Sequence, residues 1–257
     1  METHKIHSER TSIFYLMVKF NKNITAIIWD YDGTLVDSRQ KNLNVTRRIV
    51  SKILNCNFQD FPALQTIELY HHSQNITVNW RSFYEDQFGL NNEQIDSAGA
   101  MWTSFQLEDK TPSPAFNGIK ELLVELAKYR HAIVSQNSQF IIKRTLHDEG
   151  INEYFEYVIG YEEVKLSRQK PHPDGLLACI DHLGVRDSGN ILYIGDHEAD
   201  VQCAEKANTF LKKNKGKIIS VAALYGYGHD TNNWMVKPDY IANTYQDISN
   251  IILPPFR

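Results

Sequence analysis

The chain has 257 residues and a formal net charge of −4 at neutral pH. This length allows one large domain or two smaller ones, and the negative charge argues against bulk binding to nucleic acid or to an anionic membrane. No apolar run is long enough to span a bilayer, and the three cysteines, Cys56, Cys179 and Cys203, have neither CxxC nor zinc-ligand spacing, so we expect buried thiols and a cytoplasmic protein.

Residues 1–22 match no helix or strand pattern well, and we treat them as an N-terminal extension. The first clear element follows them, because the apolar and β-branched run Ile24–Trp29 has the length and composition of a buried strand. Two carboxylates, Asp30 and Asp32, come directly after this run, and Gly33 then tolerates the backbone angles of a turn. The pair therefore stands at the carboxyl edge of a predicted sheet, where ligands bind in open α/β folds.

Two carboxylates one residue apart repel each other unless a cation or a proton lies between them. Asp30 and Asp32 are therefore a candidate metal and catalytic site. The alternative is a strand end followed by an ordinary Asp-Gly turn, and this motif alone does not decide between the two.

Between Arg39 and Thr111 the strand-like runs disappear, and apolar residues recur at helical spacing between Asn-rich breaks. We predict an all-helical insert that closes at the linker Thr111–Pro114, because its prolines cannot continue a helix. The basic pair Arg47–Arg48 either faces solvent or reaches an anionic substrate. We expect the apolar and aromatic residues of the insert to form its own core: Phe83, Tyr84, Phe88, Ile95, Met101, Trp102 and Phe105.

After the linker, helix and strand patterns alternate. Helices are predicted over residues 119–127 and from Pro173 onward, each with apolar residues along one face. Strands separated by helices of this length imply parallel pairing, with helices on both faces of the sheet. The predicted strands cover residues 131–135, 157–160, 190–195, 217–224 and 240–242.

Polar residues recur where these predicted strands end. Asp30 and Asp32 follow the first strand, Ser135 ends the second, and Asp196 follows residues 190–195. Lys170 lies in a loop that its neighbouring prolines stiffen. Because parallel strands end at one edge of a sheet, we expect these side chains to form one site, in which the carboxylates hold Mg²⁺. Lys170 and Ser135 are suited to hold the oxygens of a phosphoryl group.

Four motifs in this order resemble those of the haloacid dehalogenase-like hydrolases, in particular the phosphoglycolate phosphatase-like branch with a helical cap. They cover the chain from about residue 24 to its end. The resemblance implies a Rossmann-like parallel sheet core formed by residues 23–38 and 112–257, and a cap formed by residues 39–111. The motifs are Asp30–Ser38, the strand that ends in Ser135, Lys170 with Pro171 and Pro173, and Gly195–Asp200.

The resemblance also implies a covalent mechanism. Asp30 would attack phosphorus and form an aspartyl-phosphate. Asp32 would protonate the leaving oxygen and then activate the water that hydrolyses the intermediate. Mg²⁺ would be held by Asp30, the backbone carbonyl of Asp32 and Asp196. Asp200 would complete this acidic set, either through a metal-bound water or by positioning Lys170.

The phosphate-binding set implied by the resemblance is Gly33, Thr34, Ser135, Gln136 and Lys170. Two positions depart from the family pattern. Gln136 follows the serine where the family often has asparagine, and Asn137 comes one residue later. The fourth motif carries His197 and Glu198 where smaller polar residues are common. His197 either tunes the surroundings of the metal or is simply exposed, and we expect it to be exposed.

Within the family, the second acid favours phosphoryl chemistry, because carbon–halogen cleavage needs no group to protonate an alkoxide. We therefore expect a Mg²⁺-dependent phosphatase that hydrolyses a phosphate monoester of a small metabolite, as a monomer or homodimer. A sugar-phosphate mutase and a pyrophosphatase of the same family are the alternatives. A phosphate-binding protein without catalysis is a further alternative, which the presence of every catalytic group disfavours. The identity of the phosphate ester does not follow from the motifs.

Overall fold

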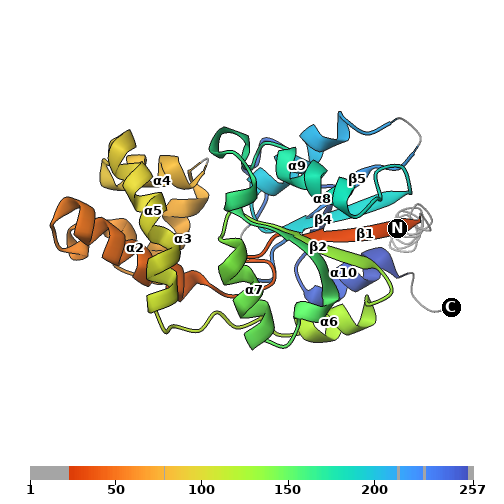
Figure 1. Ribbon diagram of the computed structural model, residues 1–257, viewed down its shortest axis with the longest axis horizontal. Helices are drawn as coiled ribbons and strands as arrows, with labels where there is room; N and C mark the ends of the chain where they lie inside the picture. The colour runs from red at the N-terminus through yellow and green to blue at the C-terminus, as the bar shows by residue number, and fades with distance from the viewer. Residues whose placement is uncertain (1–22, 78, 213–214, 228–229, 254–257) are drawn as a thin grey trace, which may run out of the picture.

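The structure is a computed structural model that describes residues 23–77, 79–212, 215–227 and 230–253, so the predicted N-terminal extension lies outside the described residues. Six parallel strands form the centre of its larger part (Figure 1), in the order β3-β2-β1-β4-β5-β6. The order therefore reverses at β1, as in Rossmann-like sheets. The strands are β1 Ile24–Trp29, β2 Arg130–Val134, β3 Phe155–Ile159, β4 Asn190–Gly195, β5 Ile218–Ala223 and β6 Tyr240–Ala242.

Both faces of the sheet are covered, as predicted. Alternate residues of β1 point to opposite faces, so Ile27 and Trp29 join one apolar cluster while Ala26 and Ile28 join another. This double burial explains why the strand reads as a continuous apolar run rather than an alternating one. The first face packs against α6 Ile119–Glu125, α7 Gln139–Asp148 and α10 Tyr245–Ile252, and the second against α8 Asp174–His182 and α9 Glu198–Asn208.

A separate group of helices lies beside the carboxyl edge of the sheet (Figure 1), inserted between β1 and α6. We call this group, residues 39–108, the cap. Its apolar residues form a third cluster, which contains the aromatic residues predicted to be its core. The cap consists of α2 Arg39–Leu54, η1 Phe58–Asp60, η2 Pro62–Leu64, α3 Ile67–Asn75, α4 Trp80–Phe88 and α5 Asn92–Glu108. The sheet part contains three further short helices: η3 Asn152–Tyr154, η4 Tyr161–Glu163 and η5 Leu166–Arg168.

The Asn-rich breaks are helix ends. Asn55 ends α2 in the left-handed conformation, with a φ of 51°, which asparagine tolerates better than most residues. Asn57 and Asn91 begin the next helices, because their side chains accept hydrogen bonds from backbone N–H groups of the first turn. The asparagines therefore divide the insert into separate helices that fold back on one another.

The basic pair of α2 serves the cap itself rather than a substrate. Arg47 donates hydrogen bonds to the carbonyls of Leu64 and Gln65, both at 2.8 Å. Arg48 forms an ion pair with Glu108 of α5. These contacts hold α2 against η2 and α5 within the cap.

Two smaller expectations have different outcomes. The thiols of Cys179 and Cys203 are buried as expected, but Cys56 is only half-buried, because it follows the C-terminal end of α2. Across the described part of the chain, none of the helices is both long and apolar enough to cross a bilayer.

Candidate active site

The carboxyl edge of the sheet and the cap enclose a cavity of about 590 Å³. Asp30 and Asp32 after β1, Ser135 after β2 and Asp196 after β4 all line it. The sheet reverses its strand order at β1, and such switch points are where open α/β folds bind ligands. The topology therefore brings together the strand-end residues that the sequence analysis selected.

The cap touches the sheet part on two sides of this cavity. The Thr103 hydroxyl of α5 lies 2.9 Å from the Tyr161 hydroxyl of η4. The ring of His71 in α3 meets the ring of Tyr227 edge-on, with 4.4 Å between centroids. The cavity is therefore bounded by the cap as well as by the strand ends.

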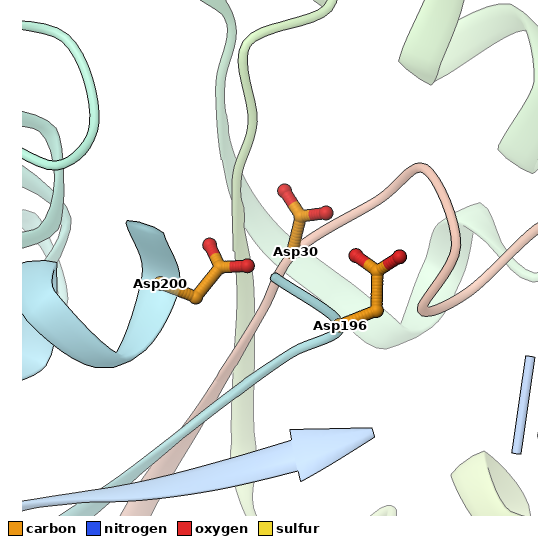
Figure 2. A group of neighbouring side chains, drawn as sticks. All are labelled: Asp30, Asp196 and Asp200. Carbon is orange, nitrogen blue, oxygen red and sulfur yellow. The ribbon is translucent and has the colours of Figure 1, made fainter. Parts of the chain in front are cut away.

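Three carboxylates crowd together at the bottom of the cavity (Figure 2). Oxygen atoms of Asp30, Asp196 and Asp200 lie within 4.8 Å of one another. Burial, followed by the charges of Asp30 and Asp200, raises the pKa of Asp196 well above its ordinary value. Burial also raises the pKa of Asp30, although Lys170 acts to lower it. A buried cluster with more carboxylates than cations, and with only oxygen ligands, fits Mg²⁺.

Two glycines allow this crowding. A Cβ on Gly33 would lie 2.1 Å from Oδ2 of Asp196, and the φ of Gly33 is +79°. A Cβ on Gly195 would lie 2.3 Å from Cγ of Asp200. Neither position has room for a side chain, so both glycines are required by the close approach of the carboxylates.

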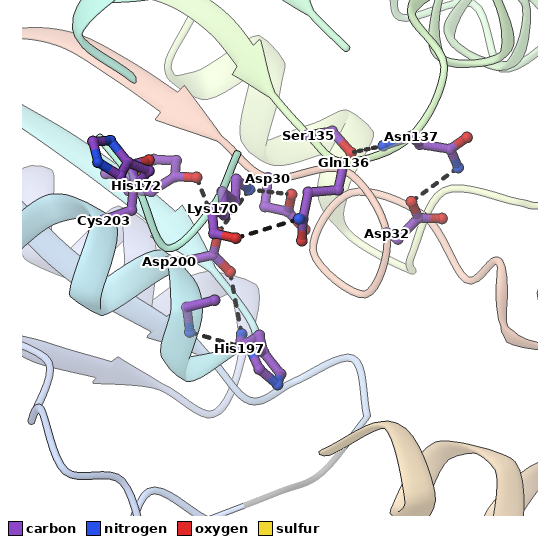
Figure 3. A network of polar contacts seen from close by, with 12 residues as sticks. Asp30, Asp32, Ser135, Gln136, Asn137, Lys170, His172, His197, Asp200 and Cys203 are labelled. Carbon is purple, nitrogen blue, oxygen red and sulfur yellow. Dashed lines mark hydrogen bonds and ion pairs between the residues drawn. The ribbon is translucent and has the colours of Figure 1, made fainter. Parts of the chain in front are cut away.

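Lys170 is the cation buried inside this cluster (Figure 3). Its Nζ lies 2.6 Å from Oδ1 of Asp30 and 2.7 Å from Oδ1 of Asp200. Burial acts to lower the pKa of Lys170, but the carboxylates of Asp200 and Asp30 together raise it above its ordinary value. Asp200 also accepts a hydrogen bond from the Tyr193 hydroxyl at 2.9 Å. Asp200 is thus placed to position Lys170 against Asp30, which is one of the two roles expected of it.

Asp32 is held by three side-chain donors. Its Oδ2 accepts a hydrogen bond from Nδ2 of Asn137 at 2.9 Å (Figure 3). Its Oδ1 accepts hydrogen bonds from the Ser38 hydroxyl and, at 3.3 Å, from Nδ2 of Asn42. Burial raises the pKa of Asp32, and its three donors act in the opposite direction. The carboxyl group is therefore oriented by both the sheet part and the first turn of α2.

Only some of the residues predicted to bind phosphate line the cavity. Ser135 and Gln136 line the cavity, and Oγ of Ser135 accepts a hydrogen bond from the backbone N–H of Asn137, which leaves its hydroxyl hydrogen to donate to a ligand. Nε2 of Gln136 donates to the carbonyl of Lys170 at 3.4 Å. Thr34 is fully buried behind the cavity wall, where its carbonyl accepts a hydrogen bond from the Tyr225 hydroxyl.

The expectation that His197 is exposed is wrong. His197 is half-buried and lines the cavity, because its Nδ1 caps α9 by accepting a hydrogen bond from the backbone N–H of Ala199 at 3.1 Å. Burial lowers the pKa of His197, as expected for a ring that accepts a hydrogen bond. Its neighbour Glu198 accepts hydrogen bonds from the backbone N–H groups of Met235 and Val236, and so holds that loop against α9.

A model of the family described as haloacid dehalogenase-like hydrolase matches residues 27–211, which is more than half of the chain. The chain belongs to this family. The matched region includes all four motifs and the cap. Each of the four motifs of this haloacid dehalogenase-like hydrolase contributes at least one residue to the cavity lining: Asp30, Ser135, Lys170 and Asp196.

Individual relatives show how far the similarity extends. The chain is 30% identical over 142 residues to the phosphoglycolate phosphatase of Pectobacterium atrosepticum, a match that covers 54% of this chain and 56% of that protein. It is 25% identical over 239 residues to pyrophosphatase PpaX of Bacillus velezensis, covering 90% of this chain and 97% of that protein. The chain therefore matches little more than half the length of the first relative and nearly all of the second.

A solved structure supports the fold. The chain superimposes on a haloacid dehalogenase-like family hydrolase from Streptococcus pneumoniae with a TM-score of 0.67 and 21% identity, covering 88% of this chain and 97% of that one. At this identity the likeness establishes the architecture of this haloacid dehalogenase-like hydrolase and nothing finer.

Three side chains of the site were missed by sequence reasoning. Asn137 is recognised in the sequence only as a displaced asparagine. Its position two residues after Ser135 is the informative feature, because the turn after β2 directs residue 137 back toward Asp32. Asn42 lies one helical turn after Ser38, which places the two on the same face of α2. Tyr193 lies two residues before Gly195 in β4, so the alternation of a strand places both on the face of the sheet where Asp200 lies.

Proposed function

We propose that this haloacid dehalogenase-like hydrolase is a phosphatase that cleaves a small-molecule phosphate monoester through an aspartyl-phosphate on Asp30. The observation that carries the proposal is the setting of Asp30, which lines the cavity at the switch point while Lys170 holds one of its oxygens at 2.6 Å. An ionised carboxylate so held presents its other oxygen as a nucleophile. Asp32 then lies two residues away, oriented by three donors for proton transfer.

The reaction balances in two steps. In the first, a carboxylate oxygen of Asp30 bonds to phosphorus, the bond from phosphorus to the alcohol oxygen breaks, and that oxygen takes the proton of Asp32. In the second, the oxygen of a water molecule bonds to phosphorus and gives a proton to Asp32, which the first step left ionised. The bond between phosphorus and the Asp30 oxygen breaks, so that phosphate leaves and the Asp30 carboxylate is restored. Ser135, Lys170 and the backbone N–H groups beyond Ser135 would stabilise charge on the phosphoryl oxygens. Gln136 completes the phosphate-binding set that we propose, whereas Gly33 and Thr34 do not line the cavity and are left out of it.

The raised pKa of Asp32 suits its proposed role. A general acid must hold its proton near neutral pH, and burial shifts the carboxyl group in that direction. Mg²⁺, held by Asp30, the backbone carbonyl of Asp32 and Asp196 with Asp200 close by, would offset the repulsion between the nucleophile and the phosphate. The fit of this donor set to a hard cation supports Mg²⁺ as the cofactor.

The test compares the wild type with Asp30→Asn on a panel of phosphate esters, with and without Mg²⁺. We expect Mg²⁺-dependent phosphate release by the wild type and a loss of at least about 10³-fold in Asp30→Asn. Trapping the aspartyl-phosphate by borohydride reduction, and locating the modified residue by mass spectrometry, would mark Asp30. Asp60→Asn is a matched control, because Asp60 is an exposed carboxylate in η1. Full activity in Asp30→Asn contradicts the proposal.

A pyrophosphatase is the second candidate, because the similarity to pyrophosphatase PpaX covers nearly the whole chain. The same residues serve phosphoanhydride cleavage, with phosphate instead of an alcohol as the leaving group. Inclusion of pyrophosphate in the substrate panel separates the two reactions.

A further inference from the structure

The cap side of the cavity differs in chemistry from the catalytic side, and this difference bears on the leaving group. The following inference rests on the proposed phosphatase activity. Because the phosphoryl group must lie against Asp30 and Lys170, the rest of the substrate extends toward the cap. Residues of α3, α4 and α5 line that end.

The size of the cavity favours a large leaving group. Its volume of about 590 Å³ falls within the range of sites for drug-sized ligands. Phosphoglycolate and pyrophosphate, with about nine non-hydrogen atoms apiece, are much smaller than the drug-sized ligands that such sites bind. Either small anion would therefore leave much of the space unfilled.

The charges of the cap side favour a leaving group without an anionic substituent. Two arginines line that part of the cavity among the residues that the structure describes, and each is paired with a carboxylate. Arg39 binds Asp37 through two hydrogen bonds, at 3.0 and 2.7 Å. Arg81 binds Asp96 at 2.7 Å. Each pair presents a dipole rather than a net positive charge, so the attraction to a second phosphate or a carboxylate is largely cancelled.

Arg39 is held from its other side as well. Its guanidinium carbon lies 4.3 Å from the centroid of the Tyr227 ring. The His71 ring packs nearly perpendicular to the ring of this same tyrosine. Arg39 is therefore fixed between Asp37 and Tyr227 at the junction of cap and sheet part, where it braces the cavity wall.

The rest of the cap-side wall is rich in aromatic side chains. Trp80 of α4 and Trp102 of α5 line the cavity, together with the side chain of Gln74. Gly99 of α5 makes room for Trp80, because a Cβ at this position would lie 3.1 Å from the indole ring. Glycine inside a helix costs roughly 0.5–1 kcal/mol relative to alanine, so its presence here indicates that the close approach of the indole matters. The guanidinium carbon of Arg81 lies over the Trp80 ring, 5.3 Å from its centroid. The parts of the two indoles that line the cavity, with neighbouring amide groups, are suited to pack against a ring and to bind its hydroxyl or amide substituents.

We propose that the natural leaving group is an uncharged, ring-containing alcohol, a sugar or a nucleoside, that packs on Trp80 and Trp102. The pairing of Arg81 with Asp96 disfavours substrates whose second end is anionic. Sugar and nucleoside esters share this chemistry, and the experiment distinguishes them.

The first experiment measures kcat/KM of the wild type for glucose 6-phosphate, adenosine 5′-monophosphate, 2-phosphoglycolate and pyrophosphate, with p-nitrophenyl phosphate as a general reporter. We expect kcat/KM for at least one of the two ring esters to exceed the values for both phosphoglycolate and pyrophosphate by about tenfold or more. The better of the two ring esters identifies the ring as a sugar or a nucleoside. A preference for phosphoglycolate or pyrophosphate overturns the inference while leaving the phosphatase proposal intact. Absence of Asp30-dependent turnover of every ester, the reporter included, overturns both.

The second experiment changes the wall. Trp80→Ala should raise KM for the preferred ring ester about tenfold, the size expected for loss of one stacked ring, and change KM for phosphoglycolate less than about twofold. Trp80→Phe keeps an aromatic ring and should restore most of the affinity, and it replaces the alanine variant if that variant does not fold. Equal effects of Trp80→Ala on ring esters and phosphoglycolate overturn the role of the indole.

Asp96→Asn tests the charge argument in the opposite direction. Removal of the carboxylate frees Arg81, so kcat/KM for phosphoglycolate should rise about three- to tenfold while the value for the ring ester stays the same or falls. Asp86→Asn makes the same change of charge at an exposed position of α4 outside the cavity wall. Equal effects of Asp96→Asn and Asp86→Asn on phosphoglycolate hydrolysis overturn the role of the ion pair between Arg81 and Asp96.

Discussion

Loss of the hydrogen bond from Asn137 should weaken Asp32 as an acid. In Asn137→Ala, Oδ2 of Asp32 loses its donor at 2.9 Å. A hydrogen bond to an ionised group contributes about 1.5–3 kcal/mol, and one pKa unit corresponds to about 1.4 kcal/mol. The pKa of Asp32, which burial already raises, should therefore rise by a further 1–2 units or so.

The pH dependence of kcat/KM measures this change. For the first step Asp32 must be protonated, so the rate falls on the alkaline side as Asp32 ionises, and this limb should move to higher pH by about 1–2 units in the variant. The maximal rate for an alkyl phosphate should also fall by about tenfold or more, since the acid is less well oriented. The effect on p-nitrophenyl phosphate should be smaller, because nitrophenolate leaves without being protonated.

Gln136→Ala is the matched control, because Gln136 also lines the cavity but donates to Lys170 instead of Asp32. It should leave the alkaline limb where it is in the wild type. An unchanged limb in Asn137→Ala, or equal losses on the alkyl and nitrophenyl esters, would refute the assignment of Asn137 to Asp32 and of Asp32 to the leaving oxygen.

Three further predictions concern stability and the metal. His131 is buried and accepts a hydrogen bond from the Trp29 indole at 3.0 Å, and burial lowers its pKa from 6.5, so the folded state holds the ring neutral. Its contribution to the free energy of unfolding is present above pH 6.5 and should be lost by up to about 1.4 kcal/mol per pH unit as the pH falls below that value. The pH dependence of this free energy, measured by urea titration, should therefore be flatter in His131→Gln, and parallel curves would contradict this. Mg²⁺ at about 100 times its Kd should raise the free energy of unfolding of the wild type by about 2.7 kcal/mol, measured by thermal denaturation; this gain should largely disappear in Asp196→Asn, and an undiminished gain would remove Asp196 from the metal site. Gly33→Ala forces a residue with a φ of +79° to carry a Cβ against Asp196. Urea titration should therefore show a fold destabilised by at least about 1–2 kcal/mol, and phosphate release should fall. A fully active and stable variant would show that the turn rearranges freely.

The sheet and the catalytic edge follow from local sequence features because their causes are local. β1 is buried on both faces from Ala26 onward, which makes Ala26–Trp29 continuously apolar and easy to recognise. Parallel pairing then requires the strand ends to meet, so Asp30, Ser135 and Asp196 could be assigned to one site without any knowledge of distances. For Asp200 the sequence left two roles open, contact with a metal-bound water or positioning of Lys170, and local features could not decide between them.

Other features depended on contacts between distant segments. His197 reads as a polar residue in a loop, and only the geometry of the turn before α9 shows that its ring caps the helix. The pairing of Arg81 with Asp96 joins α4 to α5, and no pattern within either helix predicts it. The same holds for Gly99, whose lack of a side chain has meaning only once Trp80 is seen beside it.

The cap and the sheet part keep their apolar clusters separate, and this separation has a consequence for divergence. Residues that pack within the cap share few neighbours with the residues that pack beneath the strand ends, and the effects of substitutions at distant, unconnected sites are close to additive. A change such as Gly99→Ala or Trp80→Phe should therefore alter the cap end of the cavity without disturbing the balance of charges around Lys170. Under the proposed function, substitutions confined to the cap can change which alcohol is released while the carboxylates and Lys170 at the strand ends stay the same.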